Sequence, residues 1–172
     1  PTMLKKIISG GQTGTDRAAL DAAIELGIPH GGWVPKGRLA EDGPISDKYQ
    51  LKEMPTVSYD ARTEQNVIDS DGTLIISHGE LSGGSAYTRK MAMKHGKPWY
   101  HADLNKLPTF QAAMISEDWI SKNSIEILNV AGPRHSKDPA IHGLVTVILE
   151  LVCTLKTPKI IQSEPCQDVL NF

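Results

Sequence analysis

The chain has 172 residues, of which 40% are hydrophobic and 22% charged, and its formal net charge is −2. This length and composition predict one ordinary globular domain, because two halves would each be too small to bury a sizeable core. The near-neutral charge excludes a general attraction to nucleic acid or to an anionic membrane, so we expect neither as a partner and expect any anion to be bound locally.

The cysteines and histidines show no spacing typical of a metal or redox site, and we expect no metal. Cys153 lies in an apolar helical pattern and is expected to be a buried thiol. Two cysteines are too few for a disulfide scaffold and no signal peptide is recognisable, so a cytoplasmic location is expected. The longest apolar stretch, 143–155, is too short to cross a bilayer.

The first part of the chain alternates between strand and helix patterns. Lys5–Ser9 is short and apolar and predicts a strand, and Asp16–Leu26 has apolar residues at helical spacing. A short strand is expected near Trp33–Val34. It is followed by a long polar loop, Lys36–Glu53, of a length that is usually functional or mobile.

The rest of the chain repeats this alternation and contains the clearest strand. Thr73–Ser77 is an almost uninterrupted apolar run, as expected of a parallel strand that is covered on both faces. The other expected elements are strands at 56–59, 98–102 and 125–130 and helices at 62–69, 85–95, 110–122 and 139–156, the last with Pro139 in its first turn.

Repeated strand–turn–helix units predict an α/β fold: a doubly wound, mostly parallel, Rossmann-like sheet with helices on both faces. We expect a single domain over residues 1–156, followed by a C-terminal tail over 157–172. Ligands of such sheets bind at the carboxyl ends of the strands, near the switch in strand order. Three glycine-bearing turns fall at such ends, at Gly10-Gly11, at Gly83-Gly84 and at Gly132. The sequence therefore predicts one ligand site shared by three turns.

Turns of this kind are typical of anion-binding sites. Glycine lets the backbone approach a ligand closely, and the N–H groups of the following helix then point at it. The candidate ligand-binding residues are Gly10, Gly11, Thr13, Gly14, Thr15 and Arg17 in the first turn, Gly83, Gly84, Ser85 and Thr88 in the second, and Gly132 and Arg134 in the third. The alternative is that the glycines only permit tight connections and that the arginine of the third turn is a surface residue.

The segment 31–45 combines a tryptophan with cations and acids. Lys36 and Arg38 are candidates to neutralise the anion, and the Trp33 ring suits a flat heterocycle, with a core position as its alternative. The candidates for a catalytic acid or base are Asp16, Glu41 and Asp42. Their alternative roles are ordinary ones, a helix-capping group for the first and solvated loop acids for the other two.

Several blocks in order, GGQTGTDRAAL, GGWVPKGRLAEDGPI, NVIDSDGTLII, SGGSAYT and LNVAGPRHS, resemble the putative molybdenum cofactor carrier family, over about Leu4 to Leu151. That family is a circularly permuted branch of the Rossmann-like SLOG proteins. The resemblance implies a molybdopterin-type ligand, a pterin with a terminal phosphate, or a nucleotide such as related SLOG proteins bind. A related phosphoribohydrolase family carries the motif PGGxGTxxE with a catalytic glutamate. Here Met91 and Ala18 stand where the two candidate turns would place that glutamate.

The leading hypothesis is therefore a binding or carrier protein for a small phosphate-bearing heterocycle, with molybdenum cofactor as a cargo or a nucleotide as the ligand. The alternative is a nucleotide-processing hydrolase that cleaves a nucleoside monophosphate and uses one of the three acids in place of the missing glutamate. The helix over 139–156 is apolar on more than one face, which predicts a homo-oligomer, a dimer or larger. A buried central helix is the alternative explanation of that pattern.

Overall fold

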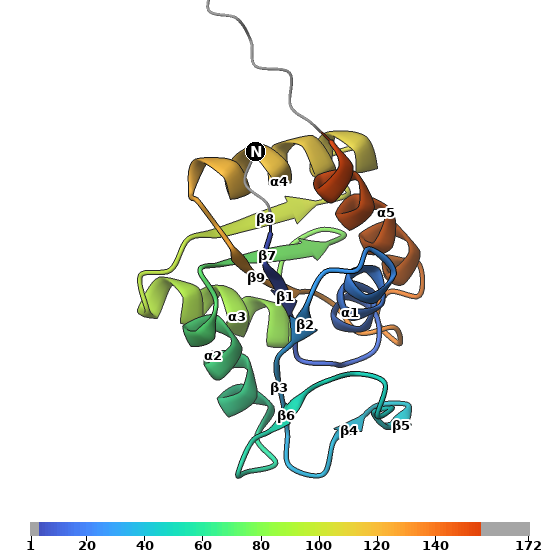
Figure 1. Cartoon of the computed structure of the whole chain (residues 1–172), viewed down its shortest axis with the longest axis vertical. Coiled ribbons are helices and arrows are strands. Elements are labelled where there is room, and N and C mark those ends of the chain that lie inside the picture. Colours follow the sequence, from blue (N-terminus) through green and yellow to red (C-terminus); the bar gives the residue numbers. More distant parts are fainter. Residues whose placement is uncertain (1–3, 156–172) are drawn as a thin grey trace, which may run out of the picture.

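The computed structural model describes residues 4–155 and has a central sheet of five parallel strands (Figure 1). The strand order is β2-β1-β9-β7-β8, and each neighbouring pair is parallel. These strands are β1 (Lys6–Ile8), β2 (His30–Gly31), β7 (Gly72–Ser77), β8 (Trp99–Asp103) and β9 (Ile127–Ala131). The predicted doubly wound α/β class is confirmed.

Five helices cover the sheet in two groups. The helices α1 (Thr15–Glu25), α4 (Thr109–Lys122) and α5 (Ile141–Thr154) pack together, and α2 (Tyr59–Asp69) packs against α3 (Gly83–Lys94) (Figure 1). Leu74 and Ile76 of β7 belong to the main core, together with residues of α1, α4 and α5. A smaller core lies between α2 and α3, around Val67 and Met91.

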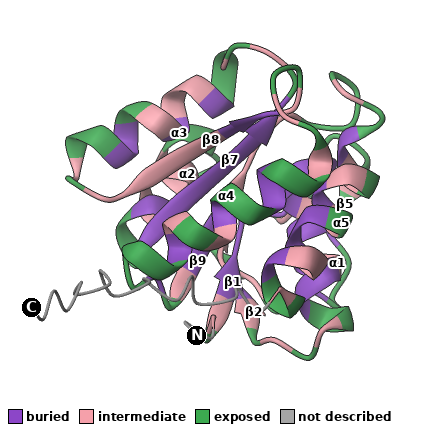
Figure 2. Ribbon diagram, turned by 90° about the horizontal axis from the view of Figure 1, so that it is seen from above, coloured by how far each residue is buried: buried purple, intermediate pink, exposed green. Residues whose placement is uncertain are grey.

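The predicted strand at Thr73–Ser77 is confirmed, since every residue of β7 is buried (Figure 2). A continuous apolar run forms here because neighbouring strands pair on both edges and helices cover both faces. The sheet order also places β1, β9 and β7 side by side. The turns that follow these three strands therefore leave the same edge of the sheet.

The predicted strand near Trp33–Val34 is confirmed, and the expected long loop over 36–53 contains three further short strands that were not predicted. The strand β3 (Trp33–Val34) pairs in parallel with β6 (Lys52–Glu53), and β4 (Leu39–Ala40) forms a hairpin with β5 (Gly43–Pro44). Leu20, Val34, Ile45 and Tyr49 form a small core that joins this segment to α1. The loop is therefore a packed substructure.

The predicted strand at 56–59 is wrong, because those residues lead into α2. The Ser58 hydroxyl caps this helix and accepts a hydrogen bond from the Ala61 N–H at 3.1 Å. A serine N-cap fixes the start of the helix at Tyr59, earlier than the predicted Arg62.

The helix α5 begins at Ile141, so the predicted position of Pro139 inside its first turn is wrong. The buried residues of α5 pack within the chain, which supports a buried helix as the explanation of its apolar pattern. The predicted homo-oligomer stays a prediction.

Cys153 is exposed on this helix, so its predicted burial is wrong. The proposed tail 157–172 lies outside the described residues.

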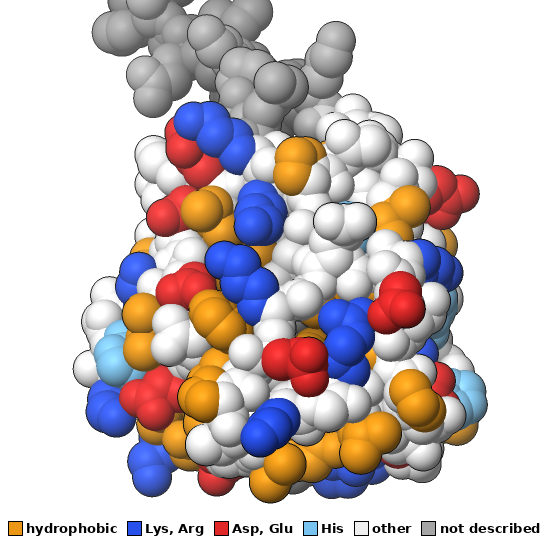
Figure 3. Space-filling view, turned by 60° about the horizontal axis from the view of Figure 1, so that its bottom comes forward, with side chains coloured by type: hydrophobic (Ala, Val, Ile, Leu, Met, Phe, Trp, Pro, Cys, Tyr) orange, Lys and Arg blue, Asp and Glu red, His pale blue; other side chains and the backbone are white. Residues whose placement is uncertain are grey.

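Over residues 4–155, no helix has both the length and the apolar character needed to cross a membrane. On the face of the molecule shown in Figure 3, lysine and arginine side chains alternate with aspartate and glutamate side chains. Charge of one sign does not dominate this face. Recognition of an anion therefore depends on local geometry.

Candidate functional site

The three predicted turns line one cavity of about 490 Å³ at the carboxyl edge of the sheet. Gln12 comes from the turn after β1 and Asp16 from the first turn of α1, Gly84 and Ser85 come from the first turn of α3, and Arg134 comes from the turn after β9. The first residues of α2 complete the wall. The cavity lies where Rossmann-like sheets place their ligands.

The turn after β7 presents an uncapped helix N-terminus to this cavity. Ser82 is the N-cap of α3 but its side chain makes no capping hydrogen bond, and the first turn contains no acidic residue. Space beside Gly84 is open, with no atom within 4 Å of where a Cβ would lie. Ser85 lines the cavity and is only 9% exposed. This N-terminus therefore offers unpaired amide donors and a positive dipole end.

A lysine from the third turn lies beside that N-terminus. Lys137 Nζ is 3.4 Å from the position that a Cβ on Gly83 would take. Among the residues that the structure describes, no carboxylate forms an ion pair with Lys137 or with Arg134. Both side chains line the cavity. Sequence reasoning selected Arg134 and missed Lys137, although the two stand in one turn.

The backbone of the first turn, in contrast, is largely satisfied within the protein. The Gln12 N–H donates to Asp16 Oδ2 at 3.4 Å, the Thr13 N–H to the side chain of Gln12 at 3.0 Å, and the Thr15 N–H to Pro133 O at 3.2 Å. Few of its amide donors remain for a ligand. The negative charge of Asp16 also opposes an anion at this helix end.

Two glycines of these turns serve close packing. A Cβ on Gly14 would lie 2.4 Å from the carbonyl oxygen of Pro133, and a Cβ on Gly132 would lie 2.2 Å from that of Ile76. Thr15 is buried behind them, with its hydroxyl unpaired. The alternative interpretation from the sequence, glycine for tight connections, therefore explains these two positions.

Asp16 and Arg62 form a buried pair at the wall of the cavity. Their side chains are 8% and 12% exposed, and Arg62 Nη1 lies 3.5 Å from Asp16 Oδ2. Burial raises the pKa of Asp16 to about 6, and the neighbouring Arg62 guanidinium limits the rise. Arg62 is a site residue that sequence reasoning missed, because nothing in its helical pattern distinguishes it from a surface arginine.

Glu41 does not line this cavity and instead joins the segment 36–53 to the turns that follow β1 and β9. It accepts hydrogen bonds from the Thr13 hydroxyl, from the Ser136 N–H at 3.0 Å and from the Ser136 hydroxyl at 2.5 Å. These hydrogen bonds lower the pKa of Glu41 to about 2, and the bond from the Ser136 hydroxyl has the largest effect, followed by the bond from the Thr13 hydroxyl. The Thr13 hydroxyl also accepts from the His135 N–H at 3.1 Å. Glu41 is therefore a structural acceptor.

The remaining predicted charges are also outside the cavity lining. Arg17 donates to Asp42 Oδ2 at 2.9 Å and to Gly11 O at 3.1 Å. Arg38 donates to backbone carbonyls of its own segment, including Ser46 O at 3.0 Å. The cavity lining also omits Lys36. The Arg17–Asp42 contact holds the segment 36–53 against α1, whereas the bonds of Arg38 stabilise the segment internally.

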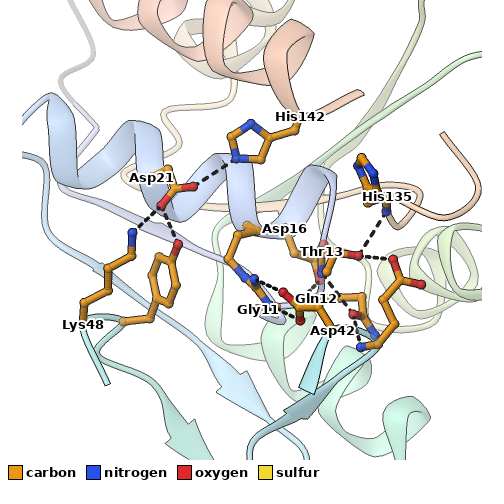
Figure 4. Close-up of polar contacts among 12 residues, drawn as sticks. Gly11, Gln12, Thr13, Asp16, Asp21, Asp42, Lys48, His135 and His142 are labelled. Atoms are coloured by element: carbon orange, nitrogen blue, oxygen red, sulfur yellow. Dashed lines mark hydrogen bonds and ion pairs between the residues drawn. The ribbon is translucent and has the colours of Figure 1, made fainter. Parts of the chain in front are cut away.

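A second polar cluster on α1 was not predicted. Asp21 accepts a hydrogen bond from the Tyr49 hydroxyl at 2.6 Å and lies 3.0 Å from His142 Nε2 and 3.4 Å from Lys48 Nζ (Figure 4). It joins α1 to α5 and to the segment 36–53. Within the described part of the chain, no group of three or more histidine, cysteine or acidic side chains is arranged to hold a metal ion.

The fold and the cavity define an α/β protein of the Rossmann-like class with a candidate site at the carboxyl edge of its sheet. The chain belongs to the circularly permutated YpsA SLOG family, whose sequence profile matches residues 7–153. The family resemblance predicted from the sequence is confirmed.

A solved structure is similar over most of the chain. It is the crystal structure of a protein from Syntrophus aciditrophicus SB that is described as a putative molybdenum carrier protein. The two share 56% sequence identity with a TM-score of 0.86, over 87% of this chain and 94% of that one. A structure of (E)-4-hydroxy-3-methyl-but-2-enyl diphosphate reductase has only 10% identity and a TM-score of 0.37, over 86% of this chain and 59% of that one. Among curated proteins, none matches the chain.

Proposed function

We propose that this protein binds and carries a small phosphate-bearing heterocycle, molybdenum cofactor or a nucleotide, with the phosphate at the N-terminus of α3. The observation that carries this proposal is the position of Lys137 Nζ beside Gly83, at a helix end without a cap or an acidic residue. The cavity lining also includes Asp60, Glu80 and Asp138, but within residues 4–155 none of these carboxylates forms an ion pair with Lys137. A phosphate would supply the missing partner for Lys137 and for this helix end.

The neighbouring groups suit a phosphate as well. Arg134 from the same turn as Lys137 offers a planar pair of donors, and the Ser85 hydroxyl lies in the cavity wall. Gly84 leaves room for an oxygen to approach the backbone. The phosphate therefore has donors from two of the three turns.

The size of the cavity supports a ligand larger than a phosphate ion. Its volume of about 490 Å³ lies within the range typical of sites for small organic ligands. The name of the 56% identical relative supports a molybdenum compound as cargo. A pterin cofactor with a terminal phosphate and a nucleoside monophosphate both have the required chemistry.

Calorimetric titration with purified molybdopterin-type cofactor and with nucleoside monophosphates tests the proposal. Lys137→Gln should weaken binding of every phosphate-bearing ligand by about 10-fold, the effect of losing one charge-assisted hydrogen bond. Lys90→Gln is the matched control, since Lys90 lies on the exposed side of the same helix, outside the cavity lining. Absence of binding by every phosphate-bearing compound would refute the proposal.

A second candidate function is hydrolysis of a nucleoside monophosphate. The observation that favours it is Asp16, a carboxyl in the cavity wall whose pKa burial raises to about 6, in the range useful for proton transfer. Glu41 and Asp42, the other two candidates, are already bonded to Ser136 and Arg17. This function requires release of free base from the nucleotide and its loss in Asp16→Asn. A product assay without any released base would eliminate it.

A further inference from the structure

We propose that Asp16 selects the ring of the ligand, by accepting hydrogen bonds from two adjacent N–H groups on one ring edge. The 2-amino-4-oxo-pyrimidine edge of guanine and of pterin has this arrangement. The inference rests on the proposed function, because it assumes that the phosphate of the ligand lies at α3.

The order of the strands places Asp16 at the opposite end of the cavity from α3. The turn that carries Asp16 follows β1, and α3 follows β7, with β9 between them. Two strand spacings separate these turns by about 10 Å. A ligand whose phosphate is held at α3 therefore extends its other end toward Asp16, across the turn that follows β9.

The bonding of the Asp16 carboxylate is incomplete. Its Oδ2 has two long contacts, 3.4 Å from the Gln12 N–H and 3.5 Å from Arg62 Nη1. Over residues 4–155, its Oδ1 accepts no hydrogen bond. The side chain is 8% exposed, and Oδ1 is not one of the fully buried atoms without a partner, so Oδ1 remains accessible from the cavity that Asp16 lines. An ionised carboxylate accepts hydrogen bonds only, and the ligand must therefore offer donors.

A flat ring also has a surface to contact beside this carboxylate. Tyr59 lines the cavity, is 45% exposed, and its ring centre lies 5.6 Å from the Arg62 guanidinium. Aromatic and guanidinium planes both stack on heterocycles. Arg62 contacts both Tyr59 and Asp16, so a ring that stacks here lies near the Asp16 carboxylate.

This arrangement discriminates between rings by hydrogen-bond pattern. Guanine and pterin present a ring N–H beside an amino group, and a carboxylate can accept from both. Adenine presents an amino group beside a ring nitrogen that is itself an acceptor, and xanthine presents an oxo group in place of the amino group. Each mismatch brings a lone pair against the carboxylate. We expect about 10- to 100-fold weaker binding of these rings, the usual cost of a wrong bidentate contact.

The test compares GMP, AMP, XMP and dihydroneopterin monophosphate by calorimetry at pH 7.5, on the wild type and on Asp16→Asn. The wild type should bind GMP or the pterin phosphate at least 10-fold more tightly than AMP and XMP. Whichever of these two ligands binds more tightly shows whether the site prefers a guanine or a pterin ring. Asp16→Asn should reverse the order of GMP and XMP, because the asparagine amide donates to the oxo group. Asp118→Asn, which removes an exposed carboxylate of α4, is the control and should keep the wild-type order.

The outcomes separate the two proposals. If all four phosphates bind the wild type with equal affinity, the ring selection is wrong while the phosphate site stands. If Asp16→Asn keeps the GMP preference of the wild type, Asp16 is not the selecting group and the inference is also wrong. If none of the four binds, the ring selection is wrong, and the titration with purified molybdopterin-type cofactor then decides whether the phosphate site stands. The wild-type comparison tests the inference even if the variant does not fold.

Discussion

Arg62 of α2 covers Gly10 at the end of β1 so closely that a Cβ on residue 10 would lie 1.8 Å from Arg62 Nη1. This contact joins two segments that are far apart in the sequence and holds the guanidinium beside Asp16. The absence of a side chain at position 10 is therefore a condition for the Asp16–Arg62 pair. Gly10, selected from the sequence as a ligand contact, has this packing role in the structure.

Gly10→Ala should displace Arg62 and change the titration of Asp16. Burial is the main cause of the raised pKa of Asp16, and Arg62 is the leading group that opposes it, so loss of the cation should raise the pKa above about 6. Carboxyl-carbon NMR across pH 4 to 9 measures this shift. Gly143→Ala, where no atom lies within 4 Å of the new methyl group, should leave the pKa unchanged. An unchanged Asp16 pKa in Gly10→Ala would contradict the packing role.

Asp16→Asn should change how stability depends on pH. The folded protein raises the pKa of Asp16 from 3.8 to about 6, so this group contributes stability that is complete below pH 3.8 and is lost as pH rises through about 6. From pH 5 to pH 8 the wild type should lose about 1 kcal/mol through this group. Urea unfolding at both pH values should show a smaller loss in Asp16→Asn. Parallel curves for the two proteins would exclude a raised pKa.

Glu41→Gln should loosen the segment 36–53. The neutral amide is a weaker acceptor for the Ser136 and Thr13 hydroxyls, so the segment should open more often and be cut several-fold faster by a protease. The pKa of Glu41 is lowered, so the contribution of its charge is present above pH 4.5 and is lost as pH falls toward about 2. The difference in cleavage rate between the wild type and Glu41→Gln should therefore become smaller as the pH falls.

Limited proteolysis at neutral pH measures this opening, with the cleavage sites assigned by mass spectrometry. Glu25→Gln, at the exposed end of α1, removes a charge without touching the segment. It should be cut at the wild-type rate. Equal cleavage rates for Glu41→Gln and Glu25→Gln would show that the bonds of Glu41 do not hold the segment in place.

Gly14→Ala should destabilise the fold strongly. Gly14 has a φ of 76° and its new methyl group would lie 2.4 Å from the carbonyl oxygen of Pro133, so strain and a backbone clash combine. We expect a loss of about 2–4 kcal/mol. Gly37→Ala separates the two effects, since Gly37 has a φ of 91° but no atom within 4 Å of the methyl group. Its loss should be about 1 kcal/mol. Similar losses in urea unfolding would show that the clash with Pro133 contributes nothing.

The candidate site could be located from the sequence, but its composition could not. Glycine-bearing turns after apolar strands identified the three turns that line the cavity, because strand ends and helix starts have local signals. Arg62 and Lys137 carry no such signal, since an arginine on a helix and a lysine in a turn are ordinary surface residues. Glu41 was an equally good candidate in the sequence, and its bonds to Ser136 show that it fastens the turns together.

The sequence by itself determined the alternation of strands and helices, the parallel sheet and the edge at which the turns meet, because apolar periodicity and glycine act over a few residues. Only the tertiary structure decided which of these turns keeps free donors. The amides after β1 are used by Gln12, Asp16 and Pro133, whereas the N-terminus of α3 is left beside Lys137. The raised pKa of Asp16 was decided in the same way, since burial by α2 and the distance to Arg62 are set by packing between segments about 50 residues apart.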